Sequence, residues 1–221
     1  MERPATVRLW DLPVRLVHWS FVALLPALWW TGDHGQIDRH KQFGTVMLGL
    51  VAFRLLWGLF GSETARFVGF LAGPQRIIAY LRGTAEPRPG HNALGGWSVV
   101  GLLGLLAAQA TIGLFAQDID GIESGPLSYL VSYDAADRAR HWHQLGFNLL
   151  LGLIALHLAA ILYYAAIKRD NLTKAMITGH KAYGAAVVQP RIAPAWRVVS
   201  CAVIAAGLAW WISNGAPLPG K

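Results

Sequence analysis

Five long apolar stretches constrain the fold of this chain more than any other feature. They cover residues 14–30, 40–60, 94–116, 143–167 and 196–212. Each is long enough to cross the hydrocarbon core of a bilayer, about 30 Å thick, as a helix. Their apolar residues are continuous rather than alternating, which excludes the strands of a membrane barrel. We therefore predict an all-α integral membrane protein with a four-helix transmembrane bundle and a fifth C-terminal transmembrane helix.

The composition excludes several other classes of protein. Charged residues make up 14% of the 221 residues, whereas soluble domains carry about 25%. This deficit argues against a nucleic-acid-binding protein, despite a formal net charge of +7, and against a disordered chain. The single cysteine, Cys201, excludes an intrachain disulfide and the C-x-x-C-H attachment of c-type haem.

The distribution of basic residues predicts the topology. Five spans place the N-terminal residues up to Arg15 and the loops 61–93 and 168–195 on one side of the membrane. Together with Arg54 and Arg197, this side holds 14 of the 19 Lys and Arg residues, and the other side holds five. Because basic residues concentrate on the cytoplasmic side, we predict a cytoplasmic N-terminus and a periplasmic C-terminus in the inner membrane of a bacterium.

Two of the loops have a character of their own. Residues 74–82 combine the apolar Ile77, Ile78 and Leu81 with Arg76 and Arg82 after a proline, which predicts a short helix. This helix lies either on the cytoplasmic membrane surface or in an ordinary loop. The outer loop 117–142 contains five acidic residues. It is either a solvated linker or a docking surface for a partner protein.

Four histidines lie within or at the ends of the predicted spans, where ionisable residues are costly and indicate function. They are His18, His40, His143 and His157. His143 and His157 are 14 residues apart, so they lie about 40° apart around one helix and ~21 Å apart along it. That helix therefore presents two imidazoles on one face, one near each membrane surface.

The predicted topology pairs these histidines. The first span enters from the cytoplasm, so His18 can meet His157 near the inner surface. The second span enters from outside, so His40 can meet His143 near the outer surface. Two His–His pairs suit two six-coordinate haems stacked across the bilayer. Arg54, 14 residues after His40, either pairs with a haem propionate or extends to the cytoplasmic headgroups.

The same histidines could also serve a zinc site or a haem-free transporter. A zinc site requires three or four ligands around one ion, whereas these pairs are ~20 Å apart. A haem-free proton or metal transporter that uses the same histidines stays open, although no intramembrane Asp or Glu accompanies them. A bis-imidazole haem has no free coordination position, which favours electron transfer over oxygen chemistry.

Several motifs together resemble one family. They are VRLVHW at 14–19, HKQFG at the start of the second span, RLLW from Arg54, GHNALGGWSV at 90–99, WHxxxxNxxxxLxxLH at 142–157 and KRDNL at 168–172. This combination resembles the bacterial cytochrome b561 family, in the branch similar to the b-type cytochrome subunit of nickel–iron hydrogenases. The resemblance covers about residues 8–180. We therefore expect a cytochrome b561-type domain over residues 1–180 and an extension over 181–221.

The resemblance implies a function. It implies two b-type haems with His18, His40, His143 and His157 as iron ligands, in a protein that carries electrons between a quinone pool and a periplasmic partner. That partner would be a c-type cytochrome or an oxidoreductase subunit. A haem-bearing membrane anchor of a hydrogenase-like or other periplasmic oxidoreductase is the alternative, so enzyme activity of the chain itself stays open. His91, in the GHN motif, is expected to make a polar contact near the inner haem or to cap a loop.

Overall fold

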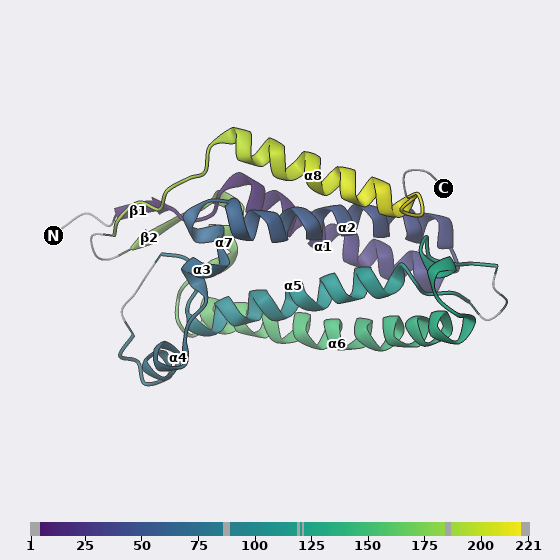
Figure 1. The fold of residues 1–221 in the computed structure, drawn as a ribbon. Coiled ribbons are helices and arrows are strands. Elements are labelled where there is room, and N and C mark those ends of the chain that lie inside the picture. The colour runs from purple at the N-terminus through teal and green to yellow at the C-terminus, as the bar shows by residue number, and fades with distance from the viewer. Residues whose placement is uncertain (1–4, 86–88, 119, 121, 184–186, 218–221) are drawn as a thin grey trace. The chain divides into compact units, whose positions relative to one another are not determined.

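The fold of the chain, seen in a computed structural model, is dominated by five long helices (Figure 1). The structure describes residues 5–85, 89–118, 120, 122–183 and 187–217. Each of the five helices is long and apolar enough to cross a membrane, which confirms the predicted all-α membrane class. They are α1 (Leu12–Asp33), α2 (Ile37–Phe60), α5 (Ala93–Gly113), α6 (Tyr133–Ala166) and α8 (Ala195–Ser213).

Short elements connect these helices. Strands β1 (Ala5–Arg8) and β2 (His180–Tyr183) form an antiparallel pair in which Val7 lies opposite Lys181. The predicted helix over 74–82 is present as α4 (Pro74–Leu81), with its proline in the first turn. The remaining short elements are η1 (Glu63–Ala65), α3 (Phe67–Phe70), η2 (Ser128–Leu130) and α7 (Leu172–Thr178).

Helix α6 begins well before the apolar stretch that predicted it. It starts at Tyr133 rather than near residue 143, and its 34 residues correspond to about 51 Å of helix. The additional turns are polar, with Asp134 in the first turn and an ion pair between Arg140 and Asp137. An acidic residue in the first turn complements the helix dipole. The hydropathy pattern therefore did not predict this segment, because its charged residues resemble a loop although it is helical.

The chain forms two compact units, and each long helix contributes residues to both. The first unit comprises residues 1–18, 54–101 and 154–200, and the second comprises 19–53, 102–153 and 201–221. Both strands and helices α3, α4 and α7 belong to the first unit.

In the first unit, the N-terminal segment is fixed to the end of α7. The backbone amides of Leu9 and Trp10 donate to the carbonyl of Gly179, at 2.8 and 3.1 Å. Gly179 adopts a left-handed conformation with φ of 80°, and a Cβ atom there would lie 2.8 Å from the carbonyl oxygen of Trp10. Only glycine satisfies both requirements. The contact holds Trp10 in a buried position beside the site described below.

In the second unit, α8 packs on α2 through small side chains. A Cβ atom at Gly49 would lie 3.4 Å from the Cβ of Ala209, and Ala205 and Ala209 are both buried. Small residues allow helices in a membrane to approach closely. The opposite side of α8 exposes large apolar side chains such as Val203 and Trp210, as expected for a surface that contacts lipid. The fifth helix is thus a packed part of the second unit.

Candidate functional site

His40 and His143 come together in the second unit. His40 lies in the first turns of α2 and His143 lies within α6. Their ring centroids are 6.1 Å apart, and the ring planes are inclined by 83°. Both side chains are half-buried. The structure therefore brings together two of the four histidines identified in the sequence.

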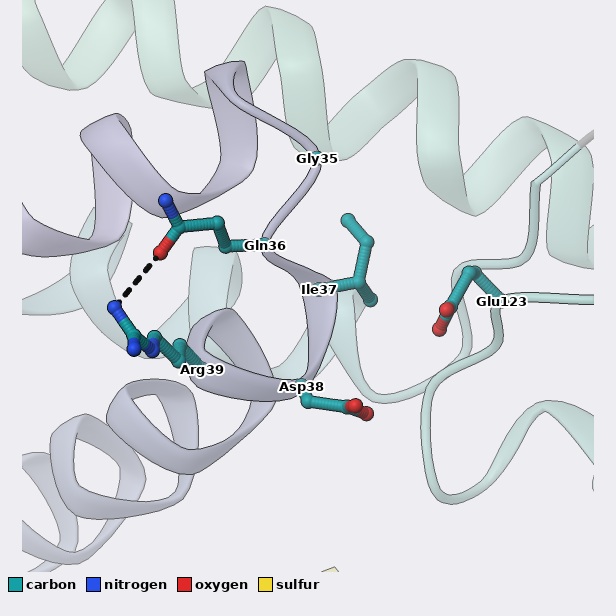
Figure 2. Close-up of a pocket in the computed structure, with 6 residues that line it drawn as sticks. All are labelled: Gly35, Gln36, Ile37, Asp38, Arg39 and Glu123. Carbon is teal, nitrogen blue, oxygen red and sulfur yellow. Dashed lines mark hydrogen bonds between the residues drawn. The ribbon is translucent and has the colours of Figure 1, made fainter.

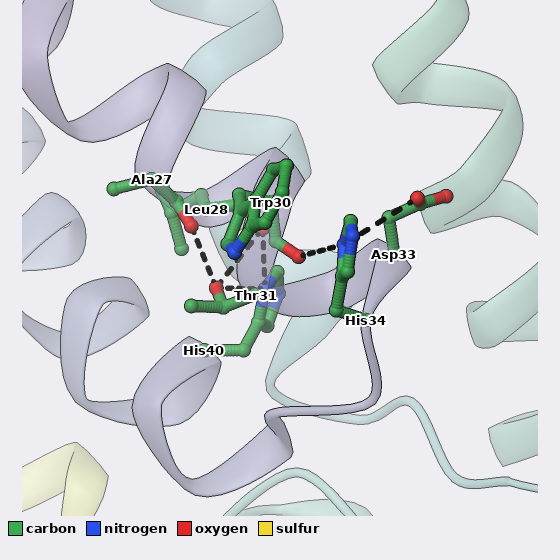
Figure 3. Close-up of polar contacts among 7 residues, drawn as sticks. All are labelled: Ala27, Leu28, Trp30, Thr31, Asp33, His34 and His40. Carbon is green, nitrogen blue, oxygen red and sulfur yellow. Dashed lines mark hydrogen bonds and ion pairs between the residues drawn. The ribbon is translucent and has the colours of Figure 1, made fainter.

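The Nδ1 atom of each of these two rings is hydrogen-bonded to a backbone carbonyl. His40 Nδ1 lies 2.9 Å from the carbonyl oxygen of Leu28, and His143 Nδ1 lies 3.0 Å from that of Gln109. Figure 3 shows the contact of His40, together with the hydroxyl of the buried Thr31 at 3.5 Å. A carbonyl acceptor fixes the proton on Nδ1 and leaves Nε2 as the basic ligand atom. Both rings are thus prepared to bind a metal through Nε2.

The spacing of the two rings fits one iron between them. Metal–imidazole bonds of about 2 Å on opposite sides of one ion place the two ring centroids roughly 6 Å apart, which is close to the observed 6.1 Å. Among the described residues, no three His, Cys, Asp or Glu side chains come together to hold a metal. Among the described residues the site is therefore a pair of histidines, the number that axial ligation of one haem uses.

Two glycines, Gly113 and Gly146, lie beside His143 and its neighbour Gln109. A Cβ atom at Gly113 would lie 2.9 Å from Cε1 of His143, and one at Gly146 would lie 2.4 Å from Oε1 of Gln109. The Nε2 group of Gln109 also donates to the carbonyl of His143, at 2.6 Å. Gln109 therefore holds His143 through both its main chain and its side chain. The sequence analysis missed Gln109, although a buried amide within an apolar span was a signal that could have identified it.

His18 and His157 both lie in the first unit. His18 lies in α1 and His157 in α6, and the two half-buried side chains are close enough to interact electrostatically. His157 also interacts electrostatically with His91. The second predicted pair is therefore also brought together, with a third imidazole nearby.

His91 lies between two aromatic rings in this part of the first unit. Its ring centroid is 4.5 Å from that of Trp10 and 4.7 Å from that of Phe70. Burial, together with the nearby positive charge of Arg54, lowers the pKa of His91 to about 3. The imidazole is therefore neutral at physiological pH.

Arg54 and Asp11 add two buried charges to the first unit. Arg54 is 6% exposed, donates to the carbonyl of Ala65 at 3.4 Å and lies 5.5 Å from the centroid of the Phe67 ring. Asp11 is 2% exposed, and its carboxylate accepts hydrogen bonds from Val14 N and Trp57 Nε1, both at 2.9 Å. The sequence analysis missed Asp11, although an aspartate just before a helix is a typical N-cap.

Two other polar features of the second unit, His34 and a surface hollow, do not include the histidine pair. His34 stacks on Trp30 and contacts the carbonyl of that residue, so it takes no part in the pair (Figure 3). A hollow of about 380 Å³, shown in Figure 2, lies in a polar part of the second unit and contains no histidine. Its lining residues are Gly35, Gln36, Ile37, Asp38, Arg39 and Glu123.

Comparison with known families shows which family the chain belongs to. The profile of the prokaryotic cytochrome b561 family matches residues 9–179. The chain belongs to this family. The matched region includes all four paired histidines, Arg54 and His91, and it excludes α8. Comparisons with curated proteins and with solved structures found no match.

Membership explains the geometry described above. Cytochromes b561 are membrane proteins that bind b-type haem and transfer electrons. A haem iron with two axial imidazoles needs two histidines whose Nε2 atoms approach from opposite sides. The pair His40–His143 is compatible with this requirement in the distance between its rings and in the hydrogen bonds of both Nδ1 atoms.

Proposed function

We propose that this cytochrome b561 holds two b-type haems and carries electrons across the bacterial cytoplasmic membrane, between a quinone pool and a periplasmic redox partner. The observation that carries the proposal is the pair His40–His143, with its 6.1 Å separation and both Nδ1 atoms bonded to carbonyls. His18 and His157 are proposed to hold the second haem. Arg54 is proposed to bind a propionate of that haem.

The residues of the chain hold and orient the haems. A six-coordinate haem exchanges single electrons and has no free position for a substrate. The carbonyls of Leu28 and Gln109 keep the Nδ1 protons of His40 and His143 in place. Gly113 leaves room for the His143 ring. These features would suit the His40–His143 site to electron transfer with little movement of its ligands.

The proposed orientation rests on the charge distribution. The excess of Lys and Arg at the N-terminus and in the loops 61–93 and 168–195 indicates a cytoplasmic N-terminus and a periplasmic C-terminus. The haem of His18 and His157 would then be the inner haem, and that of His40 and His143 the outer haem. Residues 1–180 would form the cytochrome domain and 181–221 its extension.

A second candidate function differs only in the partner. The motifs shared with the hydrogenase branch favour a haem-bearing anchor subunit of a hydrogenase-like or other periplasmic oxidoreductase. A haem-free transporter finds less support. Among the described residues no cluster of three metal-binding side chains occurs, and two of the four histidines already have Nδ1 hydrogen-bonded to carbonyls.

Absorption spectroscopy tests the proposal directly. Purified protein reduced with dithionite should show the sharp α-band of bis-histidine b haem, and a pyridine haemochromogen assay should give two haems per chain. A colourless preparation from haem-replete cells would refute the proposal. Reduction by a quinol, measured at the same α-band, tests the quinone partner. No reduction by any quinol would favour the anchor function.

A further inference from the structure

His91 presents a buried nitrogen that lacks a partner. Its Nδ1 atom is shielded from solvent and, among the residues that the structure describes, makes no hydrogen bond. Trp10 and Phe70 cover the ring from two sides. A buried polar atom without a partner costs free energy, so a ligand that completes this hydrogen bond would be bound favourably.

The loop that carries His91 is held firmly. The next residue, Asn92, accepts a hydrogen bond from the amide of Gly95 at 2.6 Å and donates to the hydroxyl of Tyr164 at 2.6 Å. A Cβ atom at Gly96 would lie 2.7 Å from the carbonyl oxygen of Phe70. The first turn of α5 therefore packs directly against the residue that covers His91. The position of the imidazole is thus fixed before any ligand binds.

Arg54 is a second buried donor with unused capacity nearby. A guanidinium has five N–H donors, and in the described part of the chain Arg54 uses one, in a long hydrogen bond to Ala65. Asp11 interacts with Arg54 electrostatically, but its two oxygens already accept hydrogen bonds from Val14 and Trp57. No ion pair of Arg54 occurs among the described residues. Arg54 and His91 interact with each other electrostatically.

The two donors together define the chemistry of the missing ligand. A guanidinium and an imidazole N–H suit the two oxygens of a carboxylate. The site also lies just before the N-terminus of α5, where the helix dipole favours an anion. His157, a proposed haem ligand, interacts with His91. The carboxylates attached to a haem at His157 are its propionates.

We propose that His91 and Arg54 form one carboxylate site that binds a propionate of the inner haem, with His91 Nδ1–H as the second donor. This inference rests on the proposed function, because it requires a haem between His18 and His157. It assigns His91 a binding role distinct from iron ligation. It also explains why an imidazole is buried between two aromatic rings in the first unit.

The test uses intact dihaem protein and haem labelled with ¹³C at the propionates. Redox difference infrared spectra report the labelled carboxylates, and a potentiometric titration gives the midpoint of each haem. His91→Phe should retain two haems, shift the carboxylate band of one haem and lower the midpoint of that haem. The midpoint falls because an unpaired propionate favours the ferric iron. His91→Asn, whose amide nitrogen can replace Nδ1, should stay close to the wild type.

Two further variants keep the proposal falsifiable if His91→Phe does not accumulate. Arg54→Lys replaces a planar donor pair by a point charge, and it should shift the same carboxylate band that responds at position 91. This band should persist in a His143→Ala background. His34→Phe, the same substitution at an exposed histidine of the second unit, should leave both labelled bands unchanged.

The outcomes separate this proposal from the function on which it rests. Unchanged carboxylate bands and midpoints in a His91→Phe protein with two haems would overturn the site. Slower oxidation of quinol with unchanged bands would also overturn it and would assign the pocket to the quinol instead. Responses of different haems at positions 54 and 91 would contradict a shared site. Wild-type protein without haem would instead refute the proposed function.

Discussion

The two histidine pairs of this cytochrome lie in different electrostatic surroundings. In the second unit, neutral groups surround His40 and His143: two backbone carbonyls, the amide of Gln109 and several glycines. The first unit, which contains His18 and His157, also buries the charges of Asp11 and Arg54, and His91 interacts electrostatically with both Arg54 and His157. Charge near a haem alters its reduction potential more than neutral dipoles do. If each pair holds a haem, as proposed, the difference teaches that one fold can give its two haems different potentials.

The largest effect is expected from removing one ligand of each pair. His143→Ala and His157→Ala should each lower the haem content from two per chain to one, because a six-coordinate haem depends on both imidazoles. The pyridine haemochromogen assay gives the count, and potentiometric titration shows which midpoint remains. The two variants should retain different midpoints. His141→Ala, two residues before His143 on the same helix, is the control and should keep both haems. Full occupancy in His143→Ala would show that this ligand assignment is wrong.

A smaller effect is expected from crowding the ring of His143. Gly113→Ala adds a Cβ atom 2.9 Å from Cε1 of the ring, so we expect a loss of about 1–3 kcal/mol in stability and a weaker hold on the outer haem. Thermal unfolding of the dihaem protein, followed by haem absorbance, measures both.

Gly104→Ala on the same helix is the matched control, since nothing lies within 4 Å of the added atom. It should be neutral or stabilising by about 0.5–1 kcal/mol. Equal behaviour of the two variants would contradict a close fit around His143.

The smallest effect distinguishes charge from polarity in the two units. Asp11→Asn removes a buried charge and one acceptor, and Gln109→Met removes a neutral donor, so each should cost about 1 kcal/mol of stability. Only Asp11→Asn should raise the midpoint of a haem clearly, because it removes a buried negative charge from the unit that contains His18 and His157. Redox titration of the two proteins measures the shifts. A larger shift of the midpoint in Gln109→Met than in Asp11→Asn would contradict the stronger effect of charge in the first unit.

The sequence predicted the large elements because membrane thickness leaves few alternatives. A continuous apolar stretch can cross a bilayer only as a helix, so five spans followed from length alone. The first turns of α6 were not predicted, because Asp134, Asp137 and Arg140 give this segment the hydropathy of a loop. They nevertheless form a helix with its own ion pair.

The sequence indicated the histidines of the candidate site, but not the groups that contact them. A spacing of 14 residues places His143 and His157 on one helix face, which any sequence reading can detect. The carbonyls of Leu28 and Gln109 carry no side-chain signal, because any residue at those positions supplies one. The contact of Trp10 with His91 depends on segments far apart in the chain, and no local pattern reveals it.

The pairing of β1 with β2 has a consequence for biosynthesis. Trp10 is held by the carbonyl of Gly179 and by a strand pair that ends at Tyr183, so the ribosome must complete most of the chain before this wall of the His91 pocket can form. The residues that orient His40 and His143 lie between Leu28 and His143, and they emerge earlier. We therefore expect the nascent protein to acquire its outer haem first and to close the inner site last.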